Sequence, residues 1–212
     1  FKNISYLASL LNFNINNNDI EVYKSYNFNN SINLEQKYIV IHLDEKWFTK
    51  YYYKDFTDIN PTSEQLKIFI EKIFYSLDGV YNIVLTSGSK ELNVLKKFTD
   101  EFEPNVNEKF LQKKIQDKYI FFMRKSTFND LELIIKKSSF LICCEGGVSH
   151  ASHNFKVKTL ALFQSNRFQH TKFWTGHMSN LILYERKNMQ DMIEDANFYN
   201  LIRNNLPNHL KS

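Results

Sequence analysis

The chain has 212 residues, enough for one large domain, and 43% of them are hydrophobic, so a substantial core can form. Its 27 Lys and Arg against 23 Asp and Glu give a formal charge of +4 with no dense basic block. Charge alone therefore argues neither for nucleic acid nor for a membrane partner.

The N-terminal part of the chain differs in pattern from the rest. Residues 1–11 predict a short amphipathic helix, and residues 12–36 are polar and rich in Asn, as in a linker or an irregular segment. The chain begins with Phe1 rather than Met, so we expect its natural start to lie upstream.

From residue 37 onward, apolar strand-like runs alternate with helical patterns. Such βα units predict an α/β fold, a Rossmann-like parallel sheet flanked by helices on both faces. Ligands bind outside the carboxyl ends of the strands in such sheets. The predicted strands are 37–43, 81–87, 118–123, 139–144, 158–163 and, with a weaker pattern, 180–185; the predicted helices are 62–74, 90–98, 126–137, 147–155 and 189–204.

Two adjacent glycines, Gly146 and Gly147, stand where the fourth predicted strand turns into a helix, in a chain that has only 5 glycines. Glycine lets a ligand approach the backbone closely, and the start of a helix presents free N–H groups and a partial positive charge. The corner therefore suits a phosphate or a diphosphate. The alternative is a tight βα turn without a ligand.

The two cysteines, Cys143 and Cys144, are adjacent and cannot form an ordinary disulfide framework. We expect buried free thiols, which fit a reducing compartment and hence a cytoplasmic location. His150 and His153 have a spacing that can hold a metal ion, but a third ligand is missing. We predict neither a metal nor a cofactor.

The segment FLICCEGGVSHASHNFKVKTLALFQSN resembles the C-terminal signature of glycosyltransferase family 9, the bacterial heptosyltransferases. In that family a strand is followed by an Asp-Thr-Gly turn, two variable residues and a His. The corresponding residues here are Glu145, Gly146, Gly147 and His150. Three departures are Glu145 for Asp, Gly146 for Thr, and Gln164 for the Gly that follows the next strand.

Two further segments are similar to the same family, so the resemblance covers about residues 37–185. The first resembles the family's first strand of the nucleotide domain, although Leu43 and Asp44 replace a common Pro-Gly. The second resembles a strand followed by a Gly and a Glu. The matching residues are His42, Trp47, Lys50 and Tyr52 in the first segment, and Gly88 and Glu91 in the second.

The resemblance implies a GT-B architecture, in which two Rossmann-like halves enclose a cleft. Residues 37–212 would be the C-terminal half, which binds a nucleotide-diphosphate sugar, and residues 1–36 a remnant of the N-terminal half or a hinge. The catalytic base would lie in the missing half. The acceptor would be a glycan or glycolipid of the bacterial surface, such as lipopolysaccharide core, reached at the cytoplasmic face of the inner membrane. No nucleic-acid partner is implied.

The resemblance also assigns a donor site that works without a metal. Lys50 would face the phosphates, Glu91 the ribose hydroxyls, and Glu145, Gly146, Gly147 and His150 the remaining parts of the donor. Each side chain has a simpler reading: a solvated lysine, a glutamate that favours a helix start, and a structural histidine. Arg167 and Lys172 fit solvated positions better, and the aromatic residues from Trp47 to Tyr53 fit packing. A non-catalytic Rossmann-like binding or assembly domain is the alternative function.

Overall fold

The computed structural model describes residues 36–48, 59–78, 80–88, 92–105, 110–124 and 126–207. These residues belong to one compact unit, which extends from Leu34 to Ser212. The predicted helix over 1–11 and nearly all of the predicted linker over 12–36 lie outside the described residues.

Within the described residues, eight strands form a single sheet in the order β3-β4-β5-β2-β1-β6-β7-β8. The pairs from β5 across to β8 are all parallel, whereas β4 is antiparallel to both β3 and β5. The Rossmann-like fold class is confirmed, and the six predicted strands form with bounds within one residue of those expected. The strands are β1 (Tyr38–Leu43), β2 (Asn82–Ser87), β3 (Glu103–Pro104), β4 (Phe110–Ile115), β5 (Lys118–Met123), β6 (Phe140–Cys144), β7 (Thr159–Phe163) and β8 (Leu181–Glu185).

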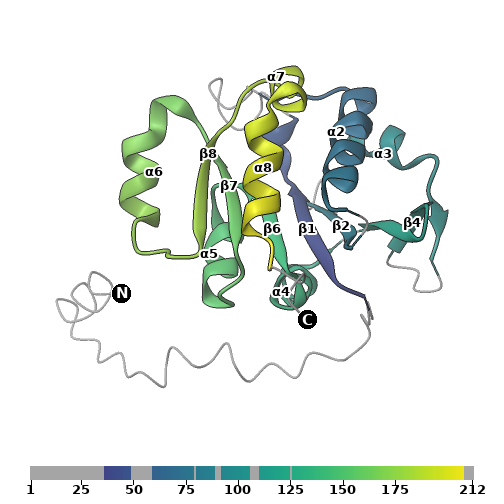
Figure 1. The fold of residues 1–212 in the computed structure, drawn as a ribbon, viewed down its shortest axis with the longest axis horizontal. Helices are drawn as coiled ribbons and strands as arrows, with labels where there is room; N and C mark the ends of the chain where they lie inside the picture. The colour runs from purple at the N-terminus through teal and green to yellow at the C-terminus, as the bar shows by residue number, and fades with distance from the viewer. Residues whose placement is uncertain are drawn as a thin grey trace. The chain divides into compact units, whose positions relative to one another are not determined.

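Helices cover both faces of the sheet, and α2 and α8 cross in front of it in Figure 1. The capping interaction that starts α2 confirms the predicted helix start: Thr62 accepts a hydrogen bond from the backbone of Gln65, whose side chain accepts one from Thr62 N–H. The helices are α2 (Ser63–Ser76), α3 (Asn93–Thr99), α4 (Phe128–Lys137), α5 (Gly147–Asn154), α6 (Phe168–Thr175), α7 (Met189–Glu194) and α8 (Ala196–Asn205), with short 3-10 turns η2 (Glu45–Trp47) and η3 (Ser165–Arg167).

The main core lies between one face of the sheet and α2, α3, α7 and α8. Alternate residues of β1 (Ile39, Ile41 and Leu43) point into this core, as the two-residue period of a strand requires. The other face of β1 meets α4, whose Ile134 carbonyl accepts a 2.9 Å hydrogen bond from the Tyr38 hydroxyl. All six residues of β1 are buried, so this strand is held from both sides and fixes the position of the loop that follows it.

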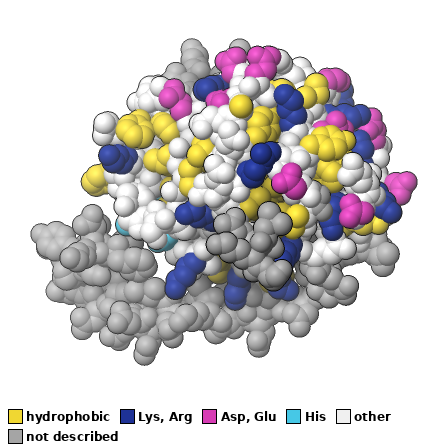
Figure 2. Space-filling view, in the orientation of Figure 1, with side chains coloured by type: hydrophobic (Ala, Val, Ile, Leu, Met, Phe, Trp, Pro, Cys, Tyr) yellow, Lys and Arg dark blue, Asp and Glu magenta, His cyan; other side chains and the backbone are white. Residues whose placement is uncertain are grey.

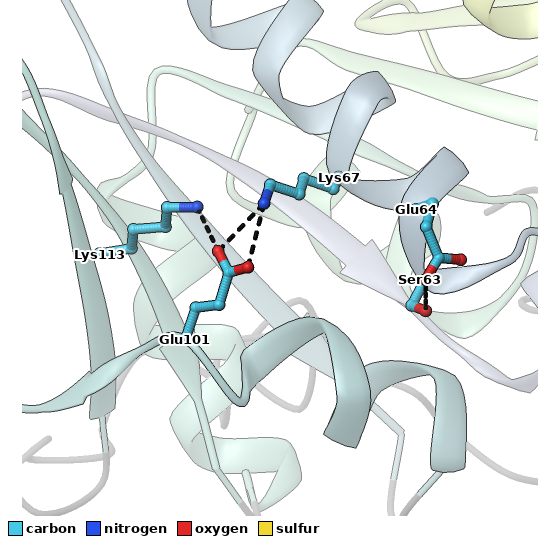
Figure 3. A network of polar contacts seen from close by, with 5 residues as sticks. All are labelled: Ser63, Glu64, Lys67, Glu101 and Lys113. Carbon is cyan, nitrogen blue, oxygen red and sulfur yellow. Dashed lines mark hydrogen bonds and ion pairs between the residues drawn. The ribbon is translucent and has the colours of Figure 1, made fainter.

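The β3–β4 hairpin was not predicted, and it makes the sheet mixed rather than purely parallel. Only Phe110 of β4 is fully buried, and the rest of the strand is half-buried or exposed, so its sequence shows no clear alternation. Figure 3 shows how polar contacts join this hairpin to the domain: the Glu101 carboxylate accepts from Lys67 of α2 at 3.1 Å and from Lys113 of β4 at 2.9 Å. These two lysines hold the pKa of Glu101 below its usual range. Because the triad is exposed, it orients the hairpin more than it stabilises the fold.

The prediction of one continuous helix over residues 189–204 was wrong. The pattern over 189–204 predicts a single helix, but the structure has α7 and α8 with a break at Asp195. The Asp195 carboxylate caps α8 by accepting from Asn197 N–H at 2.9 Å. It also accepts from the Tyr184 hydroxyl at 2.6 Å and from the Lys187 amine at 2.8 Å, and these hydrogen bonds lower the pKa of Asp195 to about 2, the one from Lys187 most strongly. A carboxylate with three donors favours a cap over the interior of a helix.

Candidate functional site

The order of the parallel strands reverses between β1 and β6. From β1 the chain proceeds outward to β2 and β5 on one side, and to β6, β7 and β8 on the other. The loops that follow β1 and β6 leave the sheet in opposite directions at this point, and the crevice between them is the usual ligand position in such folds. The loop after β1 begins at Asp44, and the turn after β6 contains Glu145 and Gly146.

The diglycine corner, which we define as residues 145–147, joins β6 to α5 as predicted, and the helix begins at Gly147. Gly146 has φ 157° and ψ −159°, a backbone conformation that is open to glycine and strained for other residues. A Cβ atom on Gly146 would lie 2.5 Å from the Lys46 Nζ atom. A Cβ atom on Gly147 would meet no heavy atom within 4 Å, so the corner is open on that side.

The start of α5 leaves two backbone donors for a ligand. The N–H groups of Ser149 and His150 both donate to the Gly146 carbonyl, at 3.1 and 3.3 Å, and Gly146 N–H donates to the Ser149 hydroxyl at 3.2 Å. Among the described residues, none accepts a hydrogen bond from the N–H of Gly147 or Val148. Those two groups carry the positive end of the helix dipole.

Lys46 brings a cationic side chain to the same corner, and the sequence reasoning missed it. Its ammonium group donates to the backbone carbonyl of Glu145 and lies 3.9 Å from the Asp44 carboxylate. The contact joins the loop after β1 to the turn after β6. The only feature of the sequence that points to Lys46 is its position in the segment that follows a predicted strand. Its role, however, depends on a contact 99 residues away in the chain.

Two titratable groups at the end of β1 are held in unusual states by burial. Desolvation lowers the pKa of His42 to about 4, and the nearby Lys46 charge adds to the effect. The neutral His42 ring shares a 2.9 Å hydrogen bond between its Nδ1 and the Thr86 hydroxyl. Burial raises the pKa of Asp44 to about 6, although Lys46 and its backbone N–H work against this shift. Asp44 therefore becomes half-protonated near pH 6, whereas an ordinary aspartate stays ionised there, and at mildly acidic pH its charge opposes a bound anion less.

Both cysteines are buried free thiols, which confirms the expectation from their position on a strand. Burial raises the pKa of the Cys143 and Cys144 thiols, so neither is available as a thiolate nucleophile. Arg186 is buried just beyond β8, and its positive charge favours the ionised forms of both Cys144 and Asp44. It adds a second cation at the carboxyl ends of the strands that the sequence reasoning did not single out.

The structure places His150 on α5, with its ring centre 6.3 Å from that of His177. His153, one turn further, shares a 2.6 Å hydrogen bond with the Asn180 side chain and is therefore structural. No contact joins the His150 ring to the diglycine corner among the described residues, so its predicted role toward a donor stays a prediction. Within the same residues, no group of three or more His, Cys, Asp or Glu side chains is arranged to hold a metal ion.

Lys50, Tyr52 and Glu91 lie outside the described residues, so the predicted roles of Lys50 and Glu91 in donor binding stay predictions. Trp47 is fully buried, with its ring 6.0 Å from that of Phe69, and this confirms the packing interpretation for the first residue of the aromatic cluster. No helix in the described ranges is both long enough and apolar enough to cross a membrane.

Comparison with known proteins gives structural neighbours but no sequence relatives. No protein-family model matches the sequence, and no curated protein does. The E. coli heptosyltransferase WaaC, solved with ADP-2-deoxy-2-fluoro heptose, is 13% identical with a TM-score of 0.55; the match covers 93% of this chain and 52% of that one. The solution structure of ALG13 is 8% identical with a TM-score of 0.51, and the match covers 75% of this chain and 83% of that one.

These matches concern the fold, since the identities are low. The chain spans about half the length of the heptosyltransferase, as the 52% coverage shows. This chain has a mostly parallel sheet whose strand order reverses at its centre, with helices on both faces. These features are typical of a Rossmann-like fold. The described residues therefore have the fold of one Rossmann-like half of a GT-B protein.

Proposed function

We propose that this chain is the donor-binding half of a metal-independent glycosyltransferase that uses a nucleotide-diphosphate sugar. The observation that carries the proposal is the meeting of the Lys46 ammonium group with the open diglycine corner at the point where the strand order reverses. The N–H groups of Gly147 and Val148, which have no acceptor within the described part of the chain, complete an anion site there. The fold of the heptosyltransferase and the resemblance of residues 37–185 to glycosyltransferase family 9 support the same function.

The chemistry of sugar transfer requires such a site. Breaking the bond between the anomeric carbon and the phosphate oxygen leaves negative charge on the diphosphate. Without a metal ion, cationic side chains and helix N–H groups must stabilise that charge. Lys46 and the start of α5 supply both kinds of donor, and Lys50 is expected to add a second cation. The base would come from the N-terminal half, and the acceptor would be a bacterial surface glycan such as lipopolysaccharide core.

The alternative is a Rossmann-like binding domain that has lost its donor site. It is favoured by Gly146, which lacks the hydroxyl of the Thr found in the family, and by the Lys46 ammonium group, which already donates to the Glu145 carbonyl. A diphosphate would have to take over part of that hydrogen bond. The two functions therefore differ in one measurable property, the affinity for nucleoside diphosphates.

Calorimetry of the chain with ADP and UDP tests the proposal, with ligand-observed NMR for weak binding. We expect Lys46→Ala to weaken binding by about 10- to 100-fold, the effect of losing a charge-assisted hydrogen bond of about 1.5–3 kcal/mol. The matched control is Lys156→Ala, because Lys156 is exposed and follows the far end of α5. Absence of binding by the unmodified chain, or equal losses in the two variants, would exclude the donor site and favour the alternative.

A further inference from the structure

The region from α5 to β8 has a one-sided charge. Between Glu145 and Glu185 the chain carries four Lys or Arg and four His residues, and no Asp or Glu. The formal charge of this stretch equals the +4 of the whole chain, so the remainder is balanced. The basic residues are too widely spaced to form a block in sequence, but α6 gathers Arg167 at its start and His170 and Lys172 within it.

The helix α6 has its apolar side chains on the outside. Its buried residues are Thr171 and Thr175, whereas Phe173 is 71% exposed, Trp174 53% and Phe168 40%. A surface helix of a globular domain ordinarily buries its apolar stripe and exposes its polar one. In Figure 2, hydrophobic and Lys or Arg side chains lie close together over the region where Figure 1 shows α6, at the left of both views. The distribution is the reverse of the ordinary one and calls for an apolar surface outside the domain.

The polar groups on this surface are arranged around the aromatic rings. The Lys172 ammonium group lies 5.9 Å from the centre of the Phe168 ring, and the Trp174 indole N–H donates to His170 at 3.0 Å. Phe173 and Trp174 meet edge to face with ring centres 5.4 Å apart. Aromatic rings with neighbouring cations are typical of segments that lie in the interface of a bilayer, where Trp and Phe enter the headgroup region and Lys or Arg meets anionic lipid.

We propose that the exposed face of α6 docks on a membrane surface that contains anionic phospholipid. The rings of Phe168, Phe173 and Trp174 enter the headgroup region, and Lys172 with its basic neighbours contacts lipid phosphates. Charge complementarity carries the choice of partner, because no acidic side chain of the Gly146–Tyr184 stretch opposes an anionic surface. The contact is peripheral and reversible, since a single short helix supplies only a few apolar side chains. It involves none of the groups at the diglycine corner and is independent of the proposed function.

Vesicle flotation of the full chain tests the docking, with vesicles of phosphatidylcholine alone and of phosphatidylcholine with phosphatidylglycerol. We expect binding to the anionic vesicles, weakened by salt, and about tenfold or greater loss in the double variant Phe173→Ala with Trp174→Ala. Lys172→Glu should lose about fivefold or more. Phe128→Ala is the matched control, because Phe128 is 55% exposed on α4 and should change nothing.

Fluorescence gives a second readout that does not depend on flotation. The chain has 2 tryptophans, and Trp47 is fully buried, so a blue shift on adding anionic vesicles reports Trp174, and Trp174→Phe should remove it. Three results would overturn the proposal. The first is failure to bind anionic vesicles, or binding that the α6 variants leave unchanged. The second is shielding of Trp174 from acrylamide without vesicles, which means that another part of the chain covers α6. The third is self-association that the double variant abolishes, which means that a second copy covers it.

Discussion

Replacing Gly147 by Asp separates the stability of the corner from its ability to bind an anion. A side chain at this position points into open space, because a Cβ atom would meet nothing within 4 Å. Replacing a glycine in a helix by a residue with a side chain stabilises the fold by about 0.5–1 kcal/mol. A carboxylate in the first turn adds about 0.3–1 kcal/mol through the helix dipole. The sum, about 1–2 kcal/mol, corresponds to a rise in melting temperature of roughly 2–8 °C for a domain of this size.

The same change should damage binding. A carboxylate at the start of α5 would lie within a few ångströms of a diphosphate held by Lys46 and the two free N–H groups. Repulsion at about 5 Å in a partly exposed site costs about 1–3 kcal/mol, so affinity for ADP or UDP should fall about 10- to 100-fold. Gly147→Asp should therefore be a more stable protein that binds more weakly, a combination that general damage to the fold cannot produce.

Gly147→Asn is the matched control, because it has nearly the same shape without the charge. Gly147→Asn should keep the stability gained by replacing the glycine, and its affinity for ADP or UDP should be within a few-fold of that of the unmodified chain. Differential scanning calorimetry gives the stabilities, and titration calorimetry gives the affinities. Equal affinity of the Asp and Asn variants would refute the reasoning, since the phosphates could not then lie at the start of α5.

Four further predictions concern groups at the carboxyl ends of the strands and in the loop after β1. Burial raises the pKa of Asp44 to about 6, above the value of about 3.9 in an unfolded chain, so its ionisation costs stability as the pH rises through this window; Asp44→Asn should gain up to about 3 kcal/mol near neutral pH and nothing near pH 4 in calorimetric unfolding. Burial lowers the pKa of His42 to about 4, so the protein should lose stability as the pH falls below about 6.5, and an Asp44→Asn variant that shows no such loss would contradict the lowered pKa. The loss should be steeper in Asp44→Asn than in the unmodified chain, because protonation of Asp44 opposes it, and an unchanged slope would contradict the raised pKa of Asp44. Ellman's reagent should find no reactive thiol in the native chain and both Cys143 and Cys144 in guanidinium chloride, and rapid labelling of the native chain would disprove their burial. Lys50→Ala should weaken binding of nucleoside diphosphates by about 1–3 kcal/mol in titration calorimetry if Lys50 faces the phosphates, and no change would leave Lys46 as the cation of the site.

The sequence predicted the parts of the fold whose signal is local. Four of the parallel strands, β1, β2, β6 and β7, are buried along their whole length, so each reads as a largely apolar run. Gly146 with Gly147 marks the turn after β6. The helix α6 was missed for the opposite reason, because its buried residues are threonines and its aromatic residues face outward. No helical period of apolar residues pointed to a buried side.

The candidate site was predictable only in part. The diglycine corner could be located from its neighbours in sequence, because a strand ends there and a helix begins. The role of Lys46 could not be predicted from its neighbours in sequence, because nothing distinguishes it from other lysines until β1 and β6 lie side by side. The depressed pKa of His42 and the raised pKa of Asp44 likewise follow from burial by segments remote in sequence. Composition cannot reveal such effects.

The bond from Lys46 to the Glu145 carbonyl also has a consequence for how the protein is made. Its two ends are 99 residues apart, so a nascent chain has Lys46 long before its partner has been synthesised. At a translation rate of about 5–20 residues per second, the interval lasts roughly 5–20 seconds. During that time β1 has at most one of its two final neighbours, β2, and the diglycine corner does not exist. The proposed anion site can therefore form only after β6 and α5 have been synthesised, and a chain that ends before them cannot capture the ligand.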